Sequence, residues 1–65
     1  MKIILNGQML ETTQQTLDAL MREQGFEGNW IATAVNSEFV PKTERGETRL
    51  ADGDRVEILT PRQGG

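Results

Sequence analysis

Short apolar stretches separated by turn residues predict the strands of a small sheet. Residues 2–5 form a largely apolar run with adjacent isoleucines, and residues 8–12 alternate well enough to form a return strand. The Asn6-Gly7 pair between them is typical of a two-residue hairpin turn, because both central positions of that turn need a positive φ. The chain is therefore predicted to open with a β-hairpin.

A helical period follows and predicts one helix over residues 13–25. Its apolar face uses the i, i+3, i+4 spacing and consists of Leu17, Leu20 and Met21. Thr16 is expected to cap the N-terminus by accepting a hydrogen bond from an early helix N–H. Gly25 suits the left-handed conformation that ends many helices, and Phe26 is expected to fold back onto the core.

Further strands are predicted over residues 30–35, 39–40 and 55–59. Pro41 and Pro61 end the second and third of these strands, because proline cannot continue a strand ladder. The polar stretch that precedes the last strand is expected to be an irregular loop that can include one helical turn. The two strands with the strongest apolar runs, the first and the last, are expected to lie side by side.

Three local features complete the sequence-based picture. Leu50 interrupts the polar loop and is expected to plug the core, and Trp30 is expected at the edge of the core. Residues 52–54 predict a tight turn, since their two carboxylates lack the further ligands of a calcium loop. Alternation over residues 30–35 does not decide which of two faces of this strand is buried. The two alternatives are Ile31, Thr33 and Val35, or Trp30, Ala32 and Ala34.

This element order predicts the α+β class, with a mixed sheet of four to five strands and one helix packed on one face. Residues 1–60 are expected to form the domain and residues 61–65 a flexible tail. The chain has 65 residues and a formal net charge of −3, with no cysteine and no histidine. Disulfides, thiolate or imidazole metal sites, thiol nucleophiles and imidazole bases are therefore excluded, and the chain is not expected to be an enzyme.

The same counts bear on partners and location. An acidic chain with a pI of about 4.7 argues against binding nucleic acid. No apolar run approaches the roughly 20 residues of a membrane span. The short apolar run at the start leaves no room for a secretory signal, so we expect a cytoplasmic protein.

The terminal Gly64-Gly65 pair is the candidate for chemistry. A carboxylate becomes a good electrophile only when it is activated, for instance as an acyl-adenylate, and the activating enzyme must exclude water. A tail without Cβ atoms is thin enough to enter such a site. Residues 61–65 can span at most about 17 Å when extended. The pair alone fits an inert terminus equally well.

Leu59 and Ile4 are the candidates for a docking surface. Each neighbours core-facing aliphatic residues on its strand and therefore points to the opposite, open face of the sheet. If the first and last strands are neighbours, these two side chains are expected to lie together near the root of the tail. An exposed apolar patch at that place is typical of a docking surface.

Several stretches match one family pattern over essentially the whole chain: residues 1–7, 16–17, 34–41 and 50–59, and the terminal Gly64-Gly65. With AVNSEFVP in the third and LADGDRVEIL in the fourth, the chain resembles the ThiS family of sulfur carrier proteins of thiamine biosynthesis. The resemblance implies a ubiquitin-like β-grasp fold. It also implies a carrier that binds no cofactor itself.

The resemblance further implies three partners. An E1-like adenylyltransferase of the ThiF type uses ATP and magnesium to adenylate Gly65, with Gly64 giving access. A persulfide donor then supplies sulfur to form a thiocarboxylate, and a thiazole synthase of the ThiG type takes that sulfur. The partner-binding surface implied for this chain consists of Ile4, Leu59, Arg62 and Gln63.

Other functions remain open on the sequence. A sulfur carrier for molybdopterin would have a similar fold, turn and tail. A ubiquitin-like protein modifier would end with Gly65 in an isopeptide bond to a lysine. A β-grasp binding module with an inert tail would need neither terminal glycine.

Overall fold

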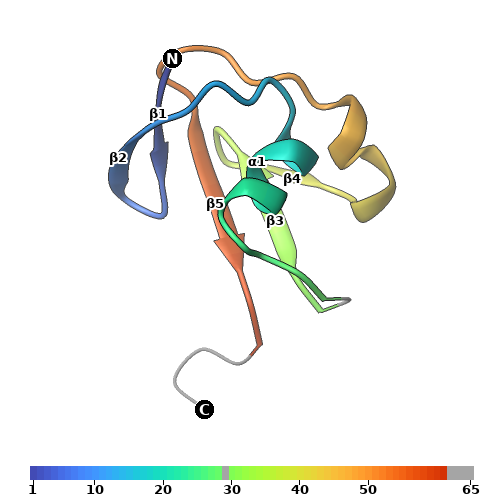
Figure 1. Cartoon of the computed structure of the whole chain (residues 1–65). Coiled ribbons are helices and arrows are strands. Elements are labelled where there is room, and N and C mark those ends of the chain that lie inside the picture. Colours follow the sequence, from blue (N-terminus) through green and yellow to red (C-terminus); the bar gives the residue numbers. More distant parts are fainter. Residues whose placement is uncertain (29, 62–65) are drawn as a thin grey trace.

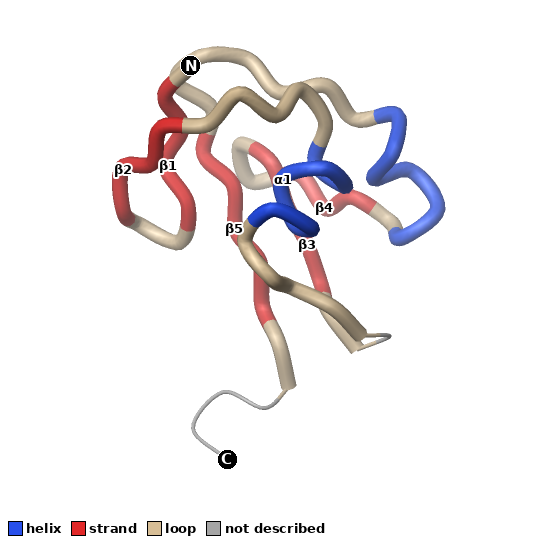
Figure 2. Tube along the Cα trace, in the orientation of Figure 1, coloured by secondary structure: helices blue, strands red, loops and turns tan. Residues whose placement is uncertain are grey.

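A five-stranded mixed sheet with the order β2-β1-β5-β3-β4 forms the body of the protein. The computed structural model describes residues 1–28 and 30–61. The strands are β1 (Lys2–Leu5), β2 (Gln8–Glu11), β3 (Ala32–Val35), β4 (Glu38–Val40) and β5 (Arg55–Leu59). Helix α1 (Leu17–Glu23) lies across one face of the sheet, and the 3-10 helix η1 (Lys42–Glu47) lies to one side of it (Figures 1 and 2). The predicted α+β architecture is confirmed.

The last strand occupies the centre of the sheet. β5 runs parallel to β1, with Leu5 beside Val56, and antiparallel to β3, with Thr33 beside Ile58. The prediction that the first and last strands are neighbours is therefore confirmed. β1 and β2 form one hairpin, β3 and β4 form another, and β5 joins the two.

Both hairpins turn through residues with positive φ. Asn6 has φ 49° and Gly7 has φ 85°, as the predicted two-residue turn requires. The second turn uses Asn36 with φ 52° and Ser37 with φ 72°. Asparagine is the residue other than glycine that most readily adopts this conformation, because its short side chain can form local hydrogen bonds.

The helix is shorter than predicted. It begins at Leu17 rather than residue 13, although the Thr16 hydroxyl accepts from the Ala19 N–H at 3.2 Å as expected of the N-cap. The residues before it are extended because they pair with a distant segment: Leu17 N–H donates to the Thr48 carbonyl and Leu50 N–H to the Gln15 carbonyl, both at 2.9 Å. Tertiary hydrogen bonds thus replace the first predicted turn.

The opposite end of the helix follows the prediction. Gly25 has φ 83°, and its N–H donates to the Arg22 carbonyl at 3.2 Å. The Phe26 N–H then donates to the Met21 carbonyl at 2.9 Å, and the Phe26 side chain packs against the core. These bonds satisfy carbonyl groups that the end of a helix otherwise leaves without partners.

The core lies between α1 and one face of the sheet. Its buried hydrophobic residues are Ile3, Leu17, Leu20, Met21, Ile31, Val40, Leu50, Val56 and Ile58. Leu50 therefore plugs the core as predicted. The alternation left open over residues 30–35 is resolved, because Ile31 and Thr33 are buried while Ala32 is exposed.

The expectation for Trp30 is wrong. The side chain is 79% exposed, because β3 begins only at Ala32 and Trp30 lies in the preceding loop. Ile31, the next residue, fills the core position instead. The last strand and the turn at residues 52–54 follow the prediction, and the return strand of the first hairpin ends one residue early at Glu11.

Arg45 is a buried cation within η1, in a stretch that the sequence predicts to be an irregular loop with at most one helical turn. Its side chain is only 7% exposed. The Nε atom donates to the Thr33 hydroxyl at 3.1 Å, and Nη2 donates to the Ile31 carbonyl. The Thr33 hydroxyl in turn donates to the Val40 carbonyl at 2.8 Å. This network ties η1 to β3 and β4.

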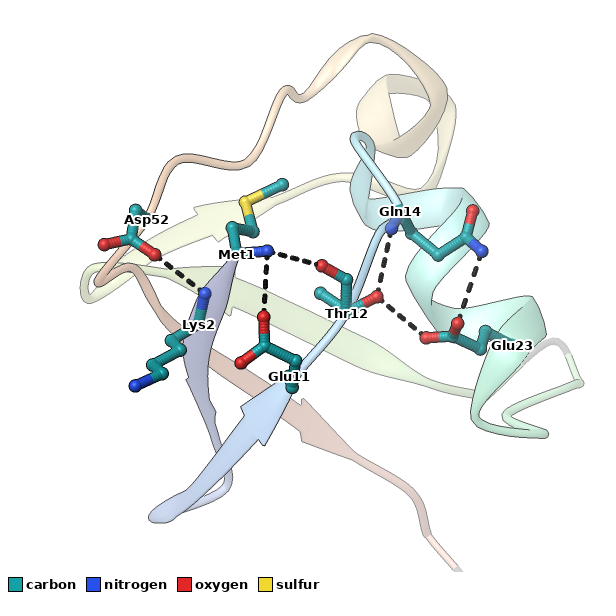
Figure 3. Close-up of polar contacts among 7 residues, drawn as sticks. All are labelled: Met1, Lys2, Glu11, Thr12, Gln14, Glu23 and Asp52. Atoms are coloured by element: carbon teal, nitrogen blue, oxygen red, sulfur yellow. Dashed lines mark hydrogen bonds and ion pairs between the residues drawn. The ribbon is translucent and has the colours of Figure 1, made fainter.

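A second polar network joins the segment after β2 to the end of α1 (Figure 3). The Thr12 hydroxyl donates to Glu23 Oε1 at 2.8 Å and accepts from the Gln14 N–H at 3.0 Å. The Gln14 side-chain amide donates to Glu23 Oε2 at 3.3 Å. These bonds, that of Thr12 first, lower the pKa of the Glu23 carboxyl below its ordinary value of 4.5.

The start of β1 is held in the same region. The Met1 ammonium donates to the Thr12 carbonyl at 2.8 Å and pairs with Glu11 at 3.3 Å (Figure 3). The Lys2 N–H donates to Asp52 Oδ1 at 2.7 Å. The end of β2, the residue after it and the turn before β5 are thus connected through the beginning of β1.

The lowered pKa of Glu23 predicts a pH-dependent contribution to stability. Because the pKa is lower in the folded state, the contribution is present above about pH 4.5 and is lost as pH falls through the folded-state pKa. We expect Glu23→Gln to lower the melting temperature at neutral pH, with a difference from the wild type that shrinks below pH 4.5. Thermal unfolding followed by circular dichroism across this range measures it. Glu27→Gln, at an exposed position, controls for loss of charge. A Glu23→Gln difference that stays constant with pH would contradict the assignment.

Candidate functional site

The sheet has an open face, which consists of the strand side chains that point away from α1. On every strand the neighbours of the core residues point to this face, because strand side chains alternate. Three large hydrophobic residues on it are well exposed: Met9 (70%), Phe39 (70%) and Leu59 (62%). Exposure of Leu59 is as the sequence predicts.

Each of these residues is paired across the sheet with another apolar residue. Met9 lies opposite Ile4 between β2 and β1. Phe39 lies opposite Ala34 between β4 and β3, and Leu59 lies opposite Ala32 between β5 and β3. The open face thus carries apolar pairs from one edge of the sheet to the other, which is a larger surface than the sequence indicated.

Charged residues of β5 run through the middle of this surface. Arg55 lies beside Ile4, and Glu57 lies beside Ala34. Both charges are exposed at the surface of the sheet. A partner that covers the middle of the face would meet apolar contacts beside the Arg55 cation and the Glu57 anion, an arrangement that fixes orientation as well as contact.

Ile4 and Leu59 share the open face but are not adjacent, which corrects the sequence-based expectation. The residue of β5 that neighbours Ile4 is Arg55, and Leu59 lies four positions further along that strand. At about 3.3 Å per residue this separates them by roughly 13 Å along the sheet. Alternation along each strand predicts their common face, but it does not reveal the register between the strands.

Leu59 is the last residue of β5 and lies near the start of β3, where the loop containing Trp30 enters the sheet. Trp30 and Phe39 are exposed aromatic residues that the sequence analysis did not assign to the surface. For Phe39 a signal existed, because strand side chains alternate and burial of Val40 places Phe39 on the opposite face. Arg62, Gln63, Gly64 and Gly65 lie outside the described residues, so their roles stay predictions.

Residues 1–28 and 30–61 hold no group of three or more acidic side chains that could bind a metal ion. None of its helices has the length and apolar composition needed to cross a membrane. A hollow of about 460 Å³ lies against the end of α1 and η1, lined by residues that include Met21, Phe26 and Arg45. Arg45 lines this hollow, and its hydrogen bonds to Thr33 and Ile31 hold its side chain in the fold.

The sheet order with a parallel central pair, and a single α-helix across one face, define a ubiquitin-like β-grasp protein. A crystal structure of the thiamine biosynthesis protein ThiS from Geobacter metallireducens matches it with a TM-score of 0.84 over 100% of both chains. The two sequences are 22% identical, so this likeness shows the fold alone. The ThiS family model matches residues 3–65, and the chain belongs to the ThiS family.

Two characterised relatives extend this finding. The chain is 34% identical over 61 residues to the sulfur carrier protein ThiS of Thermus thermophilus, covering 94% of this chain and 95% of that protein. It is 33% identical over 60 residues to a thiazole synthase of Paramagnetospirillum magneticum, covering 91% of this chain. The chain spans only 18% of the length of that thiazole synthase.

The alternation along β5 predicts losses of stability of very different size for two neighbouring substitutions. Leu59→Asp places a charge where the side chain is already exposed, and we expect it to lower the free energy of unfolding by about 1 kcal/mol or less. Ile58→Asp buries an unpaired carboxylate and is expected to cost more than about 3 kcal/mol. Urea unfolding measures both. Equal losses for the two variants would show that Leu59 is part of the core.

Proposed function

We propose that this chain is a sulfur carrier of thiamine biosynthesis whose Gly65 carboxylate holds the sulfur as a thiocarboxylate. The observation that carries the proposal is the 34% identity with a sulfur carrier protein ThiS along 94% of the chain. The Gly64-Gly65 ending supports it. Because the chain has no cysteine that could carry a persulfide, we place the sulfur on its terminal carboxyl group.

The proposed chemistry takes place at a carboxyl group and is driven by a partner. An E1-like adenylyltransferase would let the Gly65 carboxylate attack the α-phosphorus of ATP, with magnesium, and pyrophosphate would leave. A persulfide would then attack the acyl carbon and displace AMP to form an acyl disulfide. A thiol would cleave the S–S bond, which leaves the thiocarboxylate on Gly65 and forms a disulfide with the donor. The carrier supplies no catalytic group in these steps.

The open face supports docking in this scheme. Leu59 precedes Thr60 to Gly65, a stretch that can span at most about 20 Å when extended. A partner that contacts the face around Leu59 would therefore hold the terminal carboxylate within reach of its active site. The proposed contacts are Ile4, Leu59, Arg62 and Gln63, with Gly64 giving access to Gly65.

The consumer of the sulfur is proposed to be a thiazole synthase. The similarity between this chain and a segment of a thiazole synthase supports that partner. In such a protein the carrier segment and the synthase would belong to one polypeptide. The synthase would take sulfur from Gly65 and leave a carboxylate that can be activated again.

Intact-mass spectrometry tests the carrier function directly. We expect incubation with the adenylyltransferase, ATP, magnesium and a persulfide donor to give a mass gain equal to replacement of one oxygen by sulfur, located at Gly65. Omission of ATP should abolish it. Gly65→Ala adds a Cβ where the site must close around the tail, and we expect activation to slow by about 10²-fold. An unmodified wild-type chain, or sulfur found elsewhere, would refute the proposal.

Docking on the open face gives a separate prediction. Leu59→Asp places a charge in the proposed contact, and we expect the dissociation constant for the adenylyltransferase to rise about tenfold or more. Titration calorimetry measures it, and Gln8→Asp, an exposed position on the edge strand β2, controls for the added charge. Equal affinities of Leu59→Asp and wild type would remove Leu59 from the surface.

A further inference from the structure

The side chain of Asn6 takes the place of a missing strand residue beside β5. The strand pairing of β1 ends with Leu5 beside Val56, while β5 continues to Leu59. Beyond that point the Asn6 carboxamide takes over. Its Nδ2 donates to the Ile58 carbonyl at 3.1 Å, and its Oδ1 accepts from the Ile58 N–H at 2.9 Å.

These two bonds continue the parallel ladder by one step. On this side of β5 the Ile4 N–H donates to the Asp54 carbonyl and the Asn6 N–H to the Val56 carbonyl, both at 2.9 Å. The next backbone groups of β5 that face the same way are those of Ile58, two residues on. The Asn6 side chain meets both, where β1 has already turned away into its hairpin.

Without this side chain, Ile58 would lack a partner on one side. Strand residues alternate the neighbour to which their backbone groups point, so the Ile58 groups that face Asn6 cannot reach β3. Ile58 is 3% exposed, which leaves little access for water to replace the bonds. Buried N–H and C=O groups without partners are destabilising, and the end of β5 would open more readily.

We propose that Asn6 is a positioning residue that fixes the end of β5 and so sets the point from which the C-terminal segment leaves the sheet. The effect of this role on activation of the terminal carboxylate rests on the proposed function. A fixed point of departure limits the directions that the terminal carboxylate can take once the open face is docked, which favours productive entry into the activating site.

Asn36 provides a matched control from the second hairpin. Its Oδ1 accepts from the Arg55 N–H at 3.0 Å, and its N–H donates to the Arg55 carbonyl at 2.7 Å. It therefore holds the beginning of β5, as Asn6 holds the end. The φ values of the two asparagines are 49° and 52°, so glycine can replace either without backbone strain.

The test compares Asn6→Gly with Asn36→Gly. The deciding signal is amide hydrogen exchange at Leu59, whose backbone faces β3 and makes no bond to Asn6. We expect exchange at Leu59 to be about tenfold faster or more in Asn6→Gly, and close to wild type in Asn36→Gly. For ATP-dependent activation we expect kcat/KM to fall about tenfold in Asn6→Gly only, with the Kd for the adenylyltransferase unchanged.

Each result decides the inference. A Leu59 amide that exchanges at the wild-type rate in Asn6→Gly, or equally fast in both variants, would overturn the positioning role. Equal kcat/KM values in the two variants, or a kcat/KM loss matched by weaker docking, would overturn its functional consequence. A wild-type chain that is not activated would refute the proposed function, while the exchange comparison would still decide whether Asn6 holds the end of β5.

Discussion

The insertion of β5 between β1 and β3 is the interaction on which the fold depends. The two hairpins do not pair with each other, and β5 alone joins them into one sheet. The same strand supplies Val56 and Ile58 to the core and carries Arg55, Glu57 and Leu59 on the open face. Two asparagine side chains from the hairpin turns reinforce it, one near each end. Core, surface and C-terminal exit are therefore set by one element.

Local chemistry made much of this fold predictable. The Asn6-Gly7 turn, the Thr16 cap and the Gly25 helix end depend on neighbouring residues, and each forms as the sequence indicates. The predicted start of the helix was wrong because residues 15–17 pair with residues 48–50. No local sequence pattern reveals that contact. Arg45 was missed for a similar reason, since its hydrogen-bond partners lie on other elements.

The sequence predicted which side of the sheet each candidate residue points to, but it did not predict how neighbouring strands are aligned. A period of two places Leu59 outside and Ile58 inside, and the structure agrees. The same period says nothing of how far one strand slides along another, so the separation of Ile4 and Leu59 required the pairing of β1 with β5. Trp30 was predicted at the core edge as the first residue of a strand over residues 30–35, whereas β3 begins at Ala32 and Trp30 lies outside in the preceding loop.

The central position of β5 also determines how the protein responds to mechanical load. A pull on the chain beyond Leu59 acts along the axis of a strand that is bonded on both flanks, so several hydrogen bonds are sheared together instead of opening one after another. An edge strand such as β4 would peel away under far smaller force. Tension applied to the chain beyond Leu59 is therefore resisted by the sheet as a whole and does not begin by unravelling its edge.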